Sequence, residues 1–274
     1  LEHVRRNREG EGASNFEQEC RAHLDALYGK HRQALVTFDN LLSRPDVYKP
    51  PIRRQIVWTY LARENRNWAA LSADEIFRSI ELLNLNLREE PNSDKNLRLW
   101  VQAVRRSNVP PSVEEVIERV GYWKANAGTL DAVYYLYVFY ALLALEGSTL
   151  ARNDCQRFIE ECSQLAKFRR NRHKSIEWYG KGEGINRLIH HSELGEWVTN
   201  DNFWEKPTRL ERVQGRIAKI EAPQTGTIEV NGGLYAFYVP ALGGGYSRDR
   251  LNRLVDFYLG FSYDGLRAWN IKDL

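Results

Sequence analysis

The sequence predicts a two-part chain of mixed α and β structure, in which a stack of helical hairpins precedes a small five-stranded β-barrel. Between residues 14 and 168, apolar residues recur at helical spacing in segments that short polar breaks separate. Between residues 208 and 274, five short segments alternate apolar and polar residues, with Gly-rich turns among them. At 274 residues, the chain is long enough for two such domains.

Helix-start chemistry marks several segments of the first part. Ser14 is a predicted N-cap, and Ser72 and Ser112 each precede carboxylates in the first turn. Two helices recur about every 34 to 40 residues, which is the period of tetratricopeptide-type repeats, so we expect a short α-solenoid of helical hairpins. The expected helices are one that starts from Ser14, then 30–42, 52–63, 72–87, 94–106, 112–126, 130–145 and 150–168.

The β part follows the arrangement of an OB-fold, a five-stranded Greek-key barrel, because a longer connection separates its third and fourth strands. Its details resemble the cold-shock version: Gly215 lies in the first strand, the second carries Thr225 and Thr227, and Gly265 precedes the last. Five strands in so short a segment indicate a closed barrel. The expected strands are 212–220, 226–230, 234–239, 254–259 and 266–271.

Two segments lie outside these domains. Residues 1–13 are rich in Arg, Glu and Gly and have little to bury, so we expect a linker from an upstream domain. Residues 169–207 form an irregular connector whose Trp and Leu content is too high for a free linker. We expect this connector to pack across the junction, and to fix the barrel of residues 208–274 to the solenoid of residues 14–168.

Composition limits the compartment and the partners. Three cysteines are too few for a disulfide framework, which favours a reducing cytoplasm, and Cys155 and Cys162 share a helix face as expected buried thiols. No apolar run is long enough to span a membrane, so we expect no membrane partner. The net charge is only +3, so a nucleic-acid site requires local clustering of cations. Methionine is absent, so either the chain is a fragment of a larger protein or methionines are missing from the sequence.

No residue pattern marks a catalytic or metal site. Gly180, Gly182 and Gly184 lack the spacing and the preceding strand of a phosphate-binding loop, and a loop that needs positive φ explains them better. His190 and His191 are adjacent, so we expect their rings to diverge, and one of them to bond a backbone carbonyl. We therefore expect no enzymatic activity, no cofactor and no metal. A nuclease with an unrecognised site is a third hypothesis, which ranks below a sensor module and a protein-interaction scaffold.

The strongest charge feature follows the last expected helix. Residues 167–174 hold five cations in eight positions and no acid. A helix C-terminus favours one or two cations through its dipole, which does not account for five. The segment is a candidate phosphate-binding or acid-binding patch made of Lys167, Arg169, Arg170, Arg172 and Lys174.

The barrel offers a second candidate surface. OB-folds bind single strands on a face of strands two and three, through stacking aromatics and cations. Tyr235 and Phe237 share one face of strand three, whereas Thr225 and Thr227 occupy the places where the cold-shock pattern has aromatics on strand two. In the alternative interpretation, both aromatics pack against the helices. The candidate cations are Arg216 and Lys219 on strand one, and Arg248, Arg250 and Arg253 beyond the Gly-rich loop.

Several segments together resemble the carboxy-terminal tail of STAND-type NTPase defence proteins, in which TPR-like helical repeats precede an OB domain. A similar tail occurs in the sterile-alpha-motif antiviral factors of vertebrates. The likeness covers about residues 47–271, and its longest motif is the last. The segments are 47–54 (VYKPPIRR), 86–91 (NLREEP), 96–100 (NLRLW), 134–137 (YYLY), 144–147 (ALEG), 177–182 (EWYGKG) and 259–269 (LGFSYDGLRAW).

The resemblance implies a regulatory role within a longer bacterial immune protein. An upstream P-loop NTPase and an effector, such as a sirtuin-like, TIR or protease domain, would be partners in the same chain. The first hypothesis is therefore a sensor module that binds a trigger, such as RNA or single-stranded DNA, and controls the NTPase. The second is a protein-interaction scaffold, whose helical groove takes an invader protein or the rest of its own chain without binding nucleic acid.

Overall fold

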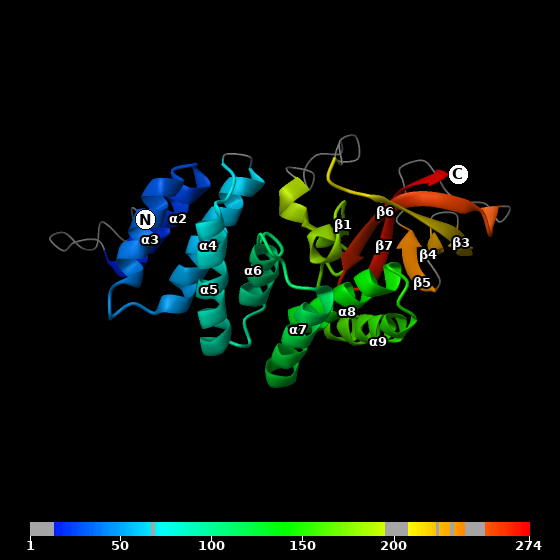
Figure 1. Cartoon of the computed structure of the whole chain (residues 1–274), viewed down its shortest axis with the longest axis horizontal. Helices are drawn as coiled ribbons and strands as arrows, with labels where there is room; N and C mark the ends of the chain where they lie inside the picture. The colour runs from blue at the N-terminus through cyan, green and yellow to red at the C-terminus, as the bar shows by residue number, and fades with distance from the viewer. Residues whose placement is uncertain (1–13, 67–68, 195–207, 223–224, 231–232, 239–249) are drawn as a thin grey trace. The chain divides into compact units, whose positions relative to one another are not determined.

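The computed structural model describes residues 14–66, 69–194, 208–222, 225–230, 233–238 and 250–274 (Figure 1). The chain divides into two compact units, Leu1–Asn108 and Val109–Leu274. The predicted linker, residues 1–13, lies outside the described residues, as do residues 195–207 of the predicted connector.

The first unit is helical. Its helices α2, α3, α4, α5 and α6 each contact the next along the chain, and α4 also contacts α2 and α6. Alternate helices therefore form one layer, with α3 and α5 behind it. Their bounds are α2 (Asn15–Leu27), α3 (His31–Leu42), α4 (Lys49–Asn65), α5 (Ala73–Glu89) and α6 (Asp94–Val104).

The predicted helix starts are confirmed at atomic level. The Ser14 hydroxyl accepts from the Glu17 N–H, which satisfies one of the free donors at the start of α2. Ser72 and Glu75 form a reciprocal capping box at the start of α5. Ser112 forms another with Glu115 in the second unit.

Three segments that carry the sequence resemblance meet in the first unit. Arg53 of α4 bonds Asn86 of α5 (3.2 Å), and Asn86 donates to the side-chain oxygen of Asn96 on α6 (3.2 Å). Asn86 also donates to the Pro50 carbonyl (2.9 Å), and all three polar side chains are buried. Because buried polar groups must be hydrogen-bonded, this network fixes how α4, α5 and α6 pack.

The second unit combines three helices with the β structure (Figure 1). The helices are α7 (Val113–Ala127), α8 (Leu130–Leu145) and α9 (Thr149–Leu165). The division at residue 108 thus falls within the predicted solenoid of residues 14–168 and not at its end. Helix α8 is buried on nearly all sides, which explains why its sequence has no polar face.

Five strands close into a mixed barrel, as the sequence predicts. They are β3 (Arg212–Ala222), β4 (Thr225–Val230), β5 (Leu234–Tyr238), β6 (Leu254–Ser262) and β7 (Gly265–Asp273). Their order is β3-β4-β5-β7-β6, and β6 pairs again with β3. Every pairing is antiparallel except β5 with β7, which is parallel. Alternate residues of each strand fill the interior, among them Ile217, Ile228 and Phe257, each 0% exposed.

The expectation of an irregular connector is wrong for its described part. Residues 177–179 form β1 (Glu177–Tyr179) and residues 188–190 form β2 (Leu188–His190), and β1 pairs with β6 of the barrel. Two short 3-10 turns, η1 (Gly184–Arg187) and η2 (His191–Leu194), follow β1 and β2. Trp178 is fully buried beside Trp269 of β7, so this segment is part of the packed unit.

Tyrosine hydroxyls join α8 to the strands. The Tyr134 hydroxyl donates to the Phe261 carbonyl (3.0 Å) and accepts from the Glu177 N–H (3.2 Å). The Tyr135 hydroxyl bonds the Glu177 carboxylate (2.9 Å), and Tyr137 bonds the carbonyl of Ser262. The second unit therefore has one continuous core of helix and barrel.

Candidate nucleic-acid interface

The basic segment, residues 167–174, follows α9 in a series of turns and is largely exposed. Arg172 donates to the Lys167 carbonyl (3.4 Å), as expected of a cation at a helix end. Within the described chain, Lys167, Arg170, Arg172 and Lys174 form no ion pair with a carboxylate. Their charges are therefore not neutralised by neighbouring acids.

An exposed aromatic side chain lies within this segment. Phe168 is 94% exposed, and the Lys167 ammonium lies 5.9 Å from the centre of its ring. The cations alone identify the segment in the sequence, although this ring lies among them. A basic run interrupted by an aromatic residue is a signal for nucleic acid, because a base can stack on the ring while phosphates meet the cations.

The strand register brings four of the predicted barrel residues onto one outer face. Lys219 of β3 lies opposite Thr227 of β4, and Thr227 lies opposite Phe237 of β5. In a second row, Arg216 lies opposite Glu229, and Glu229 lies opposite Tyr235. Tyr235 and Phe237 are 48% and 43% exposed, so they do not pack fully against the helices.

Arg267 of β7 extends the first row and links it to the basic segment. Its guanidinium lies 5.2 Å from the centre of the Phe237 ring. One Nη atom bonds Nδ1 of His173 (2.9 Å) and donates to Asp264 (3.0 Å). Burial, with a smaller contribution from the nearby Arg172, lowers the pKa of Arg267. The contacts of Arg267 thus connect the basic segment to the aromatic face. The basic segment and the outer-face residues Arg216, Lys219, Tyr235, Phe237 and Arg267 are together called here the basic–aromatic surface.

Several predicted cations are partly neutralised. Lys219 pairs with Glu221 (2.6 Å), and Arg250 pairs with Asp273. Arg216 donates to the Asn252 carbonyl (2.8 Å) and shares its row with the carboxylate of Glu229. Arg253 is exposed, and Arg248 lies outside the described residues. Among the described candidate cations, those without a neighbouring acid are therefore concentrated in the basic segment.

The other candidate residues have structural roles. As expected, Gly182 and Gly184 have positive φ angles (125° and 51°). Residues with a side chain rarely adopt such angles. The expectation that the rings of His190 and His191 diverge is wrong, because their centres lie 4.2 Å apart. The His190 ring bonds the Ser192 hydroxyl (2.7 Å). Within the described ranges, no three His, Cys, Asp or Glu side chains are grouped as a metal site would require.

The comparisons with other proteins give one finding. No family model, no curated protein and no solved structure matches the chain. Among the described helices, none has both the length and the apolar character that crossing a bilayer requires. Function must therefore be inferred from the site itself.

Proposed function

We propose that this chain is a non-enzymatic recognition module that binds single-stranded nucleic acid along the basic–aromatic surface. The observation that carries the proposal is the contact chain from His173 through Arg267 to Phe237. Phosphates would meet Lys167, Arg170, Arg172 and Lys174, while bases stack on the exposed rings. Aromatic rings accept any base, so we expect little sequence preference.

We also propose that the barrel is an OB-fold of cold-shock type, a fold that binds single strands. Its third and fifth strands, β5 and β7, pair in parallel and close a five-stranded barrel, which is consistent with a Greek-key connection. The binding face would then be β4 and β5, where Phe237 and Tyr235 lie. We also propose that the first unit is a short TPR-like solenoid, because α2, α4 and α6 form one layer with α3 and α5 behind.

The biological setting is an extension of this proposal. The sequence resemblance supports a sensor or regulatory tail of a STAND-type NTPase, in which nucleic acid is the trigger and the upstream NTPase and effector domains are the partners. The three cysteines are free thiols, which supports a reducing cytoplasm.

Fluorescence anisotropy of the full chain with labelled oligonucleotides of about 12 nucleotides tests the proposal. RNA, single-stranded DNA and duplex DNA of matched length are compared at about 50 mM and about 200 mM salt. We expect single strands to bind more tightly than duplex. The triple variant Arg170→Ala, Arg172→Ala, Lys174→Ala should weaken single-strand binding at least about tenfold at low salt.

The control is a triple variant with the same change in net charge. Arg32, Arg88 and Lys181 are exposed cations outside the surface, and their replacement by Ala should leave affinity within about twofold. If both triple variants weaken binding equally, the interaction reflects net charge and not this surface. If the wild-type chain binds no single strand at low salt, the proposal is wrong.

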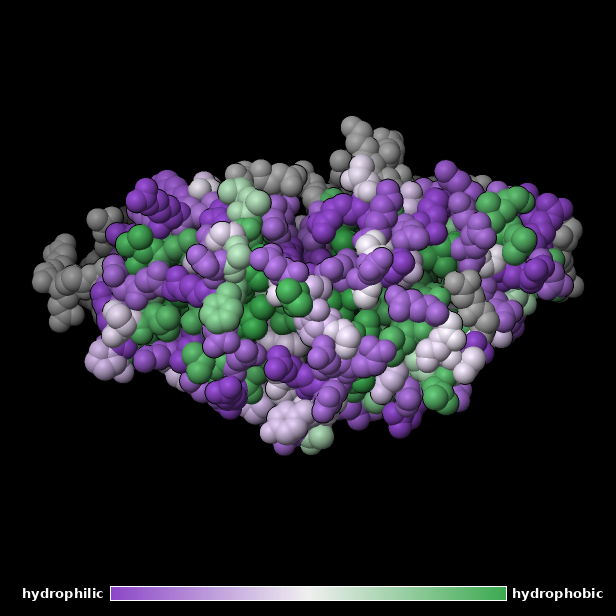
Figure 2. Space-filling view, in the orientation of Figure 1, coloured by the Kyte–Doolittle hydropathy of each residue, from purple (hydrophilic) through white to green (hydrophobic). Residues whose placement is uncertain are grey.

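A scaffold function is the second candidate, and exposed aromatics in the first unit favour it. Phe16, Tyr48 and Phe77 are each at least 66% exposed, and Figure 2 shows apolar side chains among hydrophilic ones on one face. A co-precipitation of the full chain with a separately expressed upstream NTPase region tests this function. Capture that Phe77→Ser abolishes, with no oligonucleotide binding, would favour the scaffold over nucleic-acid recognition.

A further inference from the structure

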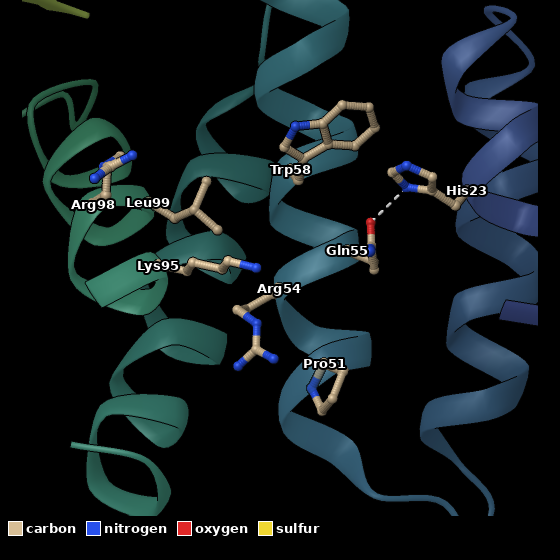
Figure 3. A pocket seen from close by; sticks show the side chains of 8 residues that line it. All are labelled: His23, Pro51, Arg54, Gln55, Trp58, Lys95, Arg98 and Leu99. Carbon is tan, nitrogen blue, oxygen red and sulfur yellow. Dashed lines mark hydrogen bonds between the residues drawn. The ribbon is translucent and has the colours of Figure 1, made fainter. Parts of the chain in front are cut away.

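A groove in the first unit lies between the layered helices α2, α4 and α6 (Figure 3). Its volume is about 320 Å³, which is at the lower end of the range for small-molecule sites. The nucleic-acid proposal above does not involve it, because that surface belongs to the second unit. Its principal side chains are His23, Arg54, Trp58, Lys95, Arg98 and Leu99.

One side of the groove is cationic. Arg54, Lys95 and Arg98 line it, and no lining side chain is a carboxylate. Arg54 is held in place from outside the lining by an ion pair with Glu90 and by a bond to Asn96 (3.4 Å). Figure 3 shows Lys95 extending from α6 into the space beside Arg54, and Lys95 forms no ion pair with a described carboxylate.

The other side is aromatic and apolar. The rings of His23 and Trp58 lie 4.9 Å apart at a tilt of 38°, so two helices present one aromatic wall. Gln55 bonds Nδ1 of His23 (2.9 Å), which fixes the orientation of the imidazole. Leu99 of α6 points toward Trp58 across the groove (Figure 3). Trp58 is only partly buried, so its indole remains accessible to a ligand.

These two sides require a ligand with a flat ring at one end and an anion at the other. A phosphate monoester carries nearly two negative charges and three acceptor oxygens, which suits a side lined by Lys and Arg donors. A purine or pyrimidine ring can stack on an indole. An acidic peptide would satisfy the cations but would leave the aromatic wall without a matching group.

We propose that this groove binds a nucleoside monophosphate, with its base against Trp58 and His23 and its phosphate on Lys95, a lining cation that forms no ion pair with a described carboxylate. Arg54 lines the same side of the groove, and its ion pair with Glu90 offsets its charge. The site is separate from the basic–aromatic surface and does not depend on the function proposed for it.

Isothermal titration of the full chain with AMP, GMP, CMP and UMP at low salt tests the proposal. Adenosine and inorganic phosphate serve as half-ligands. We expect at least one nucleotide to bind about tenfold more tightly than either half-ligand. Lys95→Glu should weaken this binding at least about tenfold, and Trp58→Ala by a similar factor.

Arg88→Ala, an exposed cation on α5 outside the groove, is the matched control and should leave nucleotide affinity unchanged. Lys95 is exposed, so its substitution is compatible with the fold. If Trp58→Ala unfolds at a lower temperature than the wild type, Trp58→Phe is used in its place. Three results would each overturn the proposal: no nucleotide binding, binding that Lys95→Glu leaves intact, or phosphate that binds as tightly as the nucleotides. An acidic peptide that binds where nucleotides do not would assign the groove to peptides instead.

Discussion

Removing the Tyr134 hydroxyl tests whether helix α8 and the barrel form one folding unit. Tyr134→Phe keeps the ring and deletes one oxygen, which is fully buried between α8 and the strands. The Glu177 N–H loses its bond to that hydroxyl, whereas the Phe261 carbonyl still accepts from the Ile176 N–H (2.8 Å). Because a buried donor without a partner costs about 1–3 kcal/mol, we expect a loss of about 2 kcal/mol in the free energy of unfolding.

Urea unfolding of the full chain, followed by Trp fluorescence, measures this loss. Hydrogen exchange provides a local readout, because the Glu177 amide should exchange faster in the variant while amides of the first unit keep their rates. The m-value should stay constant if the native fold is retained.

Tyr140→Phe is the control on the same helix. Tyr140 is partly buried and stacks on Phe158 (5.7 Å), and its hydroxyl forms no hydrogen bond with a described residue. We expect a change below about 0.5 kcal/mol. If Tyr134→Phe is equally mild and Glu177 exchange is unchanged, the hydroxyl does not join α8 to β1 and β6, and the reasoning about one core fails.

Other predictions concern the barrel, a helix, the thiols and the binding face. Gly226→Ala should destabilise the chain by about 2 kcal/mol in thermal melts, because a Cβ there would lie 2.1 Å from the Lys219 carbonyl oxygen. Gly121→Ala in α7 should instead stabilise the chain by about 0.5–1 kcal/mol in the same melts, because a Cβ at Gly121 would meet no atom within 4 Å. Burial raises the pKa of Cys155 to about 12 and also raises that of Cys162. At about pH 8 an aromatic disulfide reagent should therefore react with the partly exposed Cys20 in the native chain, and with the other two thiols only after unfolding. Reaction of all three thiols in the native chain would contradict the burial of Cys155 and Cys162. Thr227→Phe should tighten single-strand binding about fivefold or more, because it places a second ring opposite Phe237, and weaker binding would argue against stacking on this face.

Local chemistry explains why so much of the fold follows from the sequence. The serines at 14, 72 and 112 cap helices within the span of one turn, so neighbouring residues are sufficient to predict them. The five barrel strands follow from a period of two, which also places Tyr235 and Phe237 on one exposed face.

The division at residue 108 depends on contacts that local patterns do not contain. From the sequence, the apolar α8 is compatible with one more solenoid helix. Its tyrosine hydroxyls bond the carbonyls of Phe261 and Ser262, which lie more than a hundred residues later in the chain, so local patterns do not indicate their role. Strands β1 and β2 have three residues each, too few for alternation to mark them.

The candidate site shows the same limit. Local patterns do not identify Arg267, because its position opposite Phe237 depends on the parallel pairing of β5 with β7. Its bond to His173 crosses a sequence separation of 94 residues. Phe168, by contrast, stands within the basic run and could have been recognised from the sequence, by the same criterion that identified the cations around it.

The salt dependence of single-strand affinity tests the central claim most directly. Plots of the logarithm of the affinity against the logarithm of salt concentration are compared for the wild type and the triple variant at Arg170, Arg172 and Lys174. Loss of three phosphate contacts should make the slope shallower by about 2. An unchanged slope, or one that the control triple at Arg32, Arg88 and Lys181 lowers equally, would contradict the assignment of nucleic acid to the basic–aromatic surface.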